Sequence, residues 1–240
     1  MVMTVSFLIT VHLVTDLHFR THGYGLRQGN FEKGPAMKED TRAKRKDDII
    51  ACAYKLLEQN GYAGMSMLKV SKEAKASNET LYRWFGDKNG LFRHMIAQNS
   101  DEIRRSLASY ADQENATARA VLSGVSDALL RMILGERAIA LNRAAAADPS
   151  GVLGRAIAEG GRAAIAPLLE GVLQRYWSQK RPDSVFSRQI TETYISLLVG
   201  DMQVRRVIGV LPEPTAQNIA ARVDASIQAL DSLTFAVSKT

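Results

Sequence analysis

The sequence predicts an all-α protein, with an N-terminal three-helix domain that contains a helix-turn-helix, followed by a C-terminal helical bundle. From Thr41 onward, apolar residues mostly recur at the three- and four-residue spacing of amphipathic helices, with almost no strand-like alternation. The stretch from Ser66 to Phe92 has the pattern of a short helix, a tight turn, a second short helix and the start of a third. These observations predict domains at residues 37–97 and 98–240.

Composition and charge fit a globular protein with a polyanionic partner. The chain has 240 residues, 46% of them hydrophobic, and a formal net charge of +6. Residues 38–98 hold 12 Lys and Arg against 8 Asp and Glu, whereas residues 99–240 hold 16 against 15. The basic excess therefore lies on the segment with the predicted helix-turn-helix. The single cysteine, Cys52, excludes an internal disulfide, is expected in the core, and fits a reducing cytoplasm.

Residues 1–36 look foreign to the rest of the chain. The apolar start, MVMTVSFLITVHLV, is too short to span a bilayer and lacks the basic flank of a secretory signal. A short strand, a disordered arm and a spurious extension before a natural start at Met37 are the alternatives, and we favour the last. The four histidines are scattered without acidic or cysteine partners, so we expect no metal site.

The first helix is predicted from Thr41 to Asn60, with Gly61 ending it. Its start is basic, and the residues that could reach a phosphate backbone are Arg42, Lys44 and Arg45. A solvated helix start would look the same. The neighbouring motif favours an arm that follows DNA.

The second and third helices have clear caps. Ser66 is expected to cap a helix that runs to about Ala74, and Ser77 to cap the next. Leu81 and Phe85, four residues apart, are its predicted core anchors. The opposite face carries polar side chains suited to base edges in a major groove, and the fourth helix is expected to begin at Lys88 and run towards Tyr110.

The pattern Gly61-Tyr62, then S-x-x-TLY-x-x-F-x-x-K-x-x-LF from Ser77 to Phe92, resembles the TetR family of transcriptional regulators over about residues 44–96. The resemblance implies that the polar start of the third helix faces DNA, through Ser77, Asn78, Glu79, Thr80, Arg83 and Trp84. It places Tyr82 and Lys88 at phosphates, and Ser66 at the start of the helix that crosses the backbone.

Two departures from the family pattern concern DNA. Lys75 stands where a glycine is usual, at a turn position that we expect to need positive φ. Glu79 also replaces a frequent glycine, and its carboxylate would accept from a cytosine amino group or repel phosphate. Base preference stays open.

The second half is predicted to form helices near residues 116–134, 136–147, 150–177, 184–208 and 214–233, separated by proline-containing turns. Leu141-Asn142-Arg143, Gly200-Asp201 and Val207-Ile208-Gly209 resemble the AcrR-like branch of the family. The resemblance implies a homodimer through the last two long helices, with candidate contacts Ile190, Tyr194, Leu197, Leu198, Val223, Ile227 and Leu230. The alternative is that these residues fill the core of their own subunit.

The resemblance also implies a small-molecule pocket among the middle helices, which would be lined by Met132, Leu169, Leu173, Tyr176, Trp177 and Tyr194. Plain core packing is the alternative. The few charges on these faces favour a hydrophobic or amphipathic effector.

The expected function is that of a ligand-responsive repressor that binds a palindromic operator as a homodimer in the cytoplasm. An activator and a helical interaction scaffold are the alternatives. The sequence has no G-x-S-x-G, no phosphate-binding Walker loop and no histidine pair with an acidic partner, so we expect neither an enzyme nor a cofactor.

Overall fold

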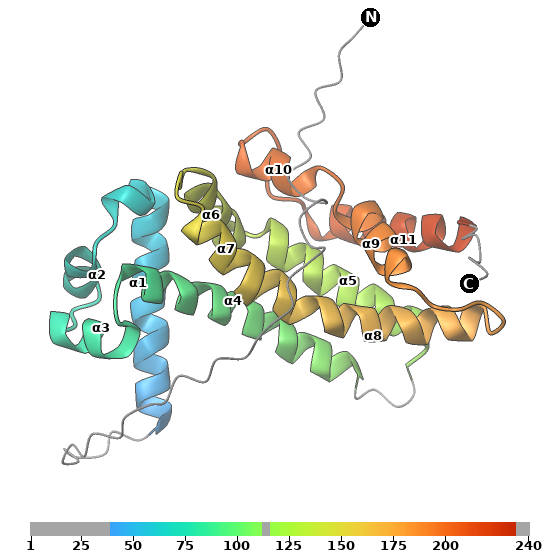
Figure 1. Ribbon diagram of the computed structural model, residues 1–240, viewed down its shortest axis with the longest axis horizontal. Coiled ribbons are helices and arrows are strands. Elements are labelled where there is room, and N and C mark those ends of the chain that lie inside the picture. Colours follow the sequence, from blue (N-terminus) through green and yellow to red (C-terminus); the bar gives the residue numbers. More distant parts are fainter. Residues whose placement is uncertain (1–38, 112–115, 234–240) are drawn as a thin grey trace, which may run out of the picture. The chain divides into compact units, whose positions relative to one another are not determined.

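The structure is a computed structural model that describes residues 39–111 and 116–233, and every regular element in these two ranges is a helix (Figure 1). The helices are α1 (Glu39–Gly64), α2 (Met67–Glu73), α3 (Asn78–Phe85), α4 (Lys88–Ala111), α5 (Ala118–Leu134), α6 (Glu136–Ala146), α7 (Val152–Ile157), η1 (Ala158–Arg162), α8 (Ala163–Lys180), α9 (Arg188–Val199), α10 (Met202–Val207) and α11 (Ala216–Ser232). The all-α fold is confirmed for these residues, and the predicted extension at 1–36 lies outside them. No helix of the described part is long and apolar enough to cross a membrane.

The predicted ends of the first three helices are largely confirmed. Gly61 interrupts α1 with a φ of 65° and a ψ of 175°, and one further turn follows it. The Ser66 side chain accepts from the backbone N–H of Lys69 at 3.2 Å, and the Ser77 side chain accepts from that of Thr80 at 3.0 Å. Each serine therefore satisfies an N–H group that its helix cannot bond internally.

A first hydrophobic core joins α1–α3 and the first half of α4 to α6 and α7. Leu81 and Phe85 are buried in it, as predicted. The Tyr54 hydroxyl donates to the carbonyl of Met95 at 2.9 Å, which fixes α1 against α4 inside this core. The later helices contribute Ala140, Leu141, Ala144, Leu153 and Ala156. The core that supports the helix-turn-helix is therefore completed by residues far beyond position 97.

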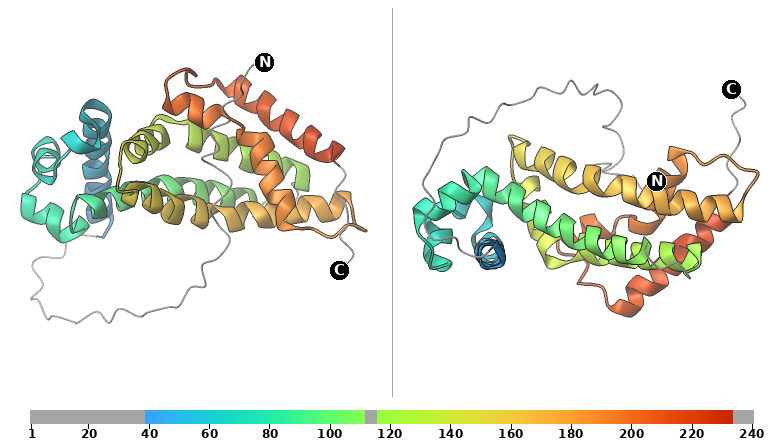
Figure 2. Two further views of the ribbon diagram at one scale, coloured as in Figure 1. Left: turned by 45° about the horizontal axis from the view of Figure 1, so that its top comes forward. Right: turned by 90° about the horizontal axis from the view of Figure 1, so that it is seen from below.

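A second hydrophobic core lies among α5, α8, α9 and α11, and Ile103 of α4 belongs to it. Because α4 contributes to both cores, it connects the helix-turn-helix to this bundle (Figures 1 and 2). Ser126 and Tyr194 are fully buried in the bundle, and their hydroxyls share a hydrogen bond of 2.6 Å.

Two long predicted helices are divided in the structure. The helix expected at 150–177 runs from α7 through one wider π-turn, η1, into α8, and the Ser100 hydroxyl of α4 donates to the Gly160 carbonyl in that turn at 2.9 Å. The single helix expected at 184–208 is wrong. Gly200, with a φ of 51° and a ψ of −132°, ends α9, and α10 begins two residues later.

The buried Ser126–Tyr194 hydrogen bond should contribute to stability. Burial raises the pKa of Tyr194 to about 12, so its hydroxyl stays protonated at neutral pH. Tyr194→Phe should lower the free energy of unfolding by about 1 kcal/mol, because the Ser126 hydroxyl loses its partner away from water. Urea denaturation measures this, with Tyr82→Phe as the control because Tyr82 is exposed. Equal unfolding midpoints for the two variants would contradict the prediction.

Candidate nucleic-acid interface

The short helix α3 presents a polar face outward because its inner face is anchored. Leu81 and Phe85 are 0% and 4% exposed, so they fix the rotation of the helix about its axis. The exposed side chains are Ser77, Asn78, Glu79, Tyr82 and Arg83, and Thr80 and Trp84 are partly exposed. The polar side chains predicted to face DNA are thus exposed or partly exposed together at this short helix and its cap.

The start of α3 is fixed by hydroxyl groups. The Ser77 and Thr80 hydroxyls lie 2.8 Å apart and share a hydrogen bond. Glu79 lies in the first turn, where a carboxylate interacts favourably with the positive end of the helix dipole. Its charge therefore has a structural role whether or not it meets a base.

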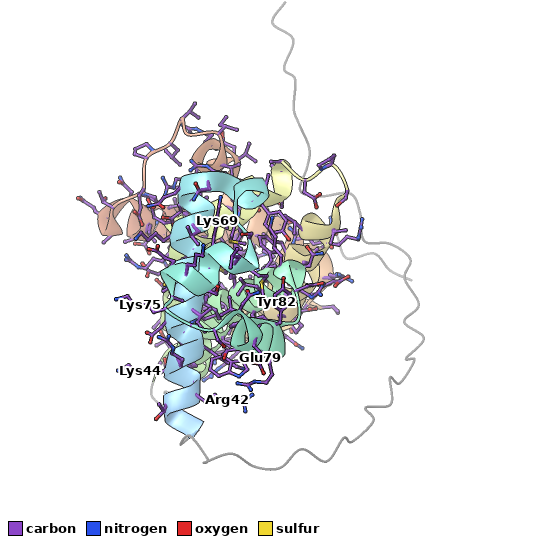
Figure 3. All side chains as sticks on the ribbon, turned by 90° about the vertical axis from the view of Figure 1, so that its left-hand side faces the viewer. Arg42, Lys44, Lys69, Lys75, Glu79 and Tyr82 are labelled. Atoms are coloured by element: carbon purple, nitrogen blue, oxygen red, sulfur yellow. The ribbon has the colours of Figure 1, made fainter. Side chains whose placement is uncertain are left out.

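Basic side chains from α1, α2 and the turn join this surface. Arg42, Lys44, Lys69 and Lys75 are exposed, and they lie with Tyr82 on the face that Figure 3 turns to the viewer. We call these five residues and the exposed side chains of α3 the basic face.

Lys69 and Lys75 were missed as candidates in the sequence. Val70 and Ala74 mark the buried side of α2, so the helical period alone would have shown that Lys69 points outward. Lys75 was predicted to be a strained turn residue, but nothing in the sequence indicated where its side chain would point.

Arg45 does not extend as a phosphate arm. Its guanidinium donates at 2.8 Å to both the Ala74 and the Lys75 carbonyls, thirty residues along the chain, and its side chain is partly buried. The basic run at the start of α1 is thus divided, because Arg45 contacts the turn while Arg42 and Lys44 remain exposed.

Lys75 has the left-handed conformation that its position predicted, with a φ of 49°, and among the described residues it is the only non-glycine with positive φ. Such a conformation costs a residue with a Cβ about 1–2 kcal/mol. Contacts with neighbouring residues must therefore stabilise the turn in this conformation.

Lys88 at the start of α4 is held by an aromatic side chain. Its ammonium lies 3.9 Å from the centre of the Tyr62 ring, and burial lowers the pKa of Lys88. The Tyr62 hydroxyl donates to the Asn89 side-chain carbonyl at 2.5 Å, and its ring packs edge-on against Phe92. The resemblance placed Lys88 at a phosphate, and this contact restricts where its ammonium can lie.

Trp84 is less available to DNA than the resemblance implied. Its ring is partly buried against the first core, and the Arg42 guanidinium lies 5.7 Å from its centre. The pair connects the start of α1 to the end of α3.

An all-helical chain in which a capped recognition helix stands on a basic face is a helix-turn-helix DNA-binding protein by architecture. Residues 49–95 match the family model described as bacterial regulatory proteins, tetR family. These residues therefore belong to the DNA-binding domain of the TetR family of transcriptional regulators.

The similarity to characterised relatives is concentrated at the N-terminal domain. The HTH-type transcriptional regulator HbdR of Aromatoleum sp. (strain CIB) is 38% identical over 68 residues, which are 27% of this chain and 30% of HbdR. The BetI regulator of Stenotrophomonas maltophilia (strain R551-3) is 24% identical over 94 residues, which are 38% of this chain and 48% of BetI. The chain therefore spans less than half the length of these relatives.

The fold is shared over a greater length. A TetR-family regulator from Mesorhizobium loti MAFF303099 superposes with a TM-score of 0.63 at 22% identity, covering 78% of this chain and 95% of that one. FadR from Bacillus subtilis, solved in complex with stearoyl-CoA, superposes with a TM-score of 0.58 at 18% identity, covering 78% and 97%.

The six residues predicted to line a pocket lie in the second core. Met132 is partly buried and the others are fully buried, namely Leu169, Leu173, Tyr176, Trp177 and Tyr194. A cavity of about 190 Å³ lies elsewhere, lined by Arg131, Leu134, Gly135, Glu213, Pro214 and Ile219. None of the six predicted residues lines this cavity.

Most residues expected at a dimer interface are buried within their own subunit. The side chains that are at most 1% exposed are Ile190, Tyr194, Leu198, Val223, Ile227 and Leu230. Their apolar stripes join α9 and α11 to α5 and α8, so they cannot reach a second copy. Leu197 is partly exposed and is the exception in this set.

Lys88→Ala should weaken binding to every DNA sequence. The loss of one phosphate contact should lower the slope of log affinity against log salt by about one unit. Fluorescence anisotropy over a salt series measures the slope. Arg175→Ala, which removes an exposed charge from α8, should leave it unchanged. Equal slopes for Lys88→Ala and the wild type would remove Lys88 from the interface.

Proposed function

We propose that this protein is a homodimeric repressor that binds a palindromic operator in the cytoplasm and releases it when a small molecule binds its second domain. The observation that carries the proposal is the basic face, in which side chains from α1, α2 and the turn surround a capped recognition helix. One chain supplies one recognition helix, so a palindrome requires two chains related by a dyad.

The outer surfaces of α9 and α11 support the dimer. The two helices pack on each other, and the exposed residues along the outer side of α11 are small or polar, including Gln217, Ala221, Ala225 and Gln228. Short side chains allow two helices to approach closely. Because the apolar stripes serve the core of the subunit, we place the contact on these outer residues and on the partly exposed Leu197.

The connection between the two cores supports regulation by a ligand. α4 contributes to both, so an effector that favours one packing of the second core changes how the recognition helix is presented. The second core is apolar and contains the Ser126–Tyr194 hydroxyl pair, which favours a hydrophobic or amphipathic molecule. Acyl-CoA thioesters and fatty acids are the first compounds to test by thermal shift, given the stearoyl-CoA bound to FadR.

In vitro selection of DNA from a random pool tests DNA binding and symmetry together. The full chain should enrich a palindrome with half-sites about one DNA turn apart. Enrichment of no sequence would favour the alternative of an interaction scaffold. Transcription in vitro from a promoter that carries the selected site then distinguishes the two kinds of regulator, because a repressor lowers the transcript level and an activator raises it.

Asn78→Ala should change base preference without changing the salt slope. An amide side chain at the start of a recognition helix can pair with a base edge, and losing that contact should cost roughly 1–3 kcal/mol at one position of each half-site. Repeating the selection with the variant reveals the position. An identical selected sequence would mean that Asn78 does not read a base.

Ala221→Arg should dissociate the dimer, because a long charged side chain would enter the centre of the outer face of α11. Light scattering coupled to size exclusion should then give the mass of one chain, and operator affinity should fall. Ala163→Arg, at an exposed alanine of α8, is the matched control. A dimeric Ala221→Arg variant would refute the proposed interface.

A further inference from the structure

The turn between α2 and α3 has the hydrogen bonds of a Schellman motif, in which a glycine normally follows the helix. The N–H of Ala76 donates to the Ser71 carbonyl at 2.9 Å, and the N–H of Lys75 donates to the Lys72 carbonyl at 3.2 Å. This pattern requires a left-handed residue after Ala74, and here that residue is Lys75, with a φ of 49°.

The carbonyls of Ala74 and Lys75 point out of this motif, and both accept from the Arg45 guanidinium at 2.8 Å. Arg45 comes from α1, so it ties the turn to a separate and longer helix. A planar guanidinium can reach two carbonyls with a fixed geometry, which suits it to hold a strained backbone.

The strained conformation brings a charge to the basic face. The Lys75 side chain is exposed and lies on the same face as Lys44 and Lys69 (Figure 3). A glycine at this position would relieve the backbone but would supply no cation. The strain of a lysine at this position is offset only if its ammonium makes a favourable contact.

From these contacts we infer that Lys75 binds a DNA phosphate from within the turn, and that Arg45 is the positioning residue that keeps Lys75 in its left-handed conformation. The inference rests on the proposed DNA binding for its first half. Its second half concerns the folded chain alone. Arg45 thereby supports DNA binding indirectly, by fixing the turn that carries Lys75, and its own guanidinium makes no phosphate contact.

The first experiment isolates the charge of Lys75. Lys75→Met keeps a long side chain at the same backbone position, so the melting temperature should stay close to that of the wild type. The salt slope should fall by about 0.9, so the ratio of wild-type to variant affinity should shrink about threefold between about 50 and 200 mM salt. Arg175→Met removes the same charge from α8 and should leave the slope unchanged. A slope for Lys75→Met equal to that of Arg175→Met overturns the phosphate contact.

The second experiment isolates Arg45 with a double-mutant cycle against Lys75→Gly. Arg45→Ala should lower the melting temperature of the wild-type chain clearly, and by half as much or less in the Lys75→Gly background, where the turn needs no support. Equal losses in both backgrounds would overturn the positioning role.

The salt slope tests Arg45 a second time. The double variant should have the same slope as Lys75→Gly alone, because Arg45 contacts carbonyls. A further fall of about 0.9 would make Arg45 an ordinary phosphate contact. If the wild type binds no DNA, the proposed function fails, and the thermal cycle still decides whether Arg45 holds the turn.

Discussion

The placement of the recognition helix depends on the burial of Leu81 and Phe85 in the first core. Eight residues of helix have little stability of their own, so packing must provide it. That core is closed by Leu141 and Leu153, which come from α6 and α7, while the Tyr54–Met95 hydrogen bond fixes α1 against α4. The polar outer face of α3 is therefore oriented by apolar contacts that involve the second half of the chain.

The cations on and around the basic face differ in the partners that they have within the chain. Arg42 and Lys69 are exposed, yet the Arg42 guanidinium lies 5.7 Å from the centre of the Trp84 ring and the Lys69 ammonium donates to the Gly64 carbonyl at 2.7 Å. Lys88 is held by the Tyr62 ring. Arg45 has the same charge and a similar place in the sequence, yet its hydrogen-bonding capacity is directed at backbone carbonyls. Positive charge near DNA therefore does not define a contact. The partners of each cation decide whether it is available for phosphate.

Local signals in the sequence predicted the helix-turn-helix well. Ser66 and Ser77 are cap residues with partners three positions away, and Leu81 and Phe85 are four apart, so short windows contain the information. Arg45 could not be assigned in this way, because its partners lie thirty residues along the chain and a basic run looks the same in either role. The apolar faces of α9 and α11 were equally ambiguous. An apolar helix face indicates that it is buried, but not whether it is buried in its own subunit or against another one. The division at Gly200 was missed because an apolar pattern continues on both sides of it.

The two cores constrain how a signal could reach DNA under the proposed regulation. Since α6 and α7 belong to the first core, the helix-turn-helix cannot rotate without moving them as well. Any movable joint must then include the three places where the chain passes from one core to the other. They are α4 between Ile96 and Ile103, the turn at Gly135, and the π-turn η1. In the α4 interval Ser100 is buried and donates to Gly160 in the π-turn, where the helical hydrogen-bond ladder is already widened. A polar contact at a widened turn is easier to rearrange than close apolar packing, because one hydrogen bond has a small net free energy whereas filled cores resist any change of volume. A change in the packing of α8 would therefore reach α3 through this contact and along α4, with the first core moving as one body.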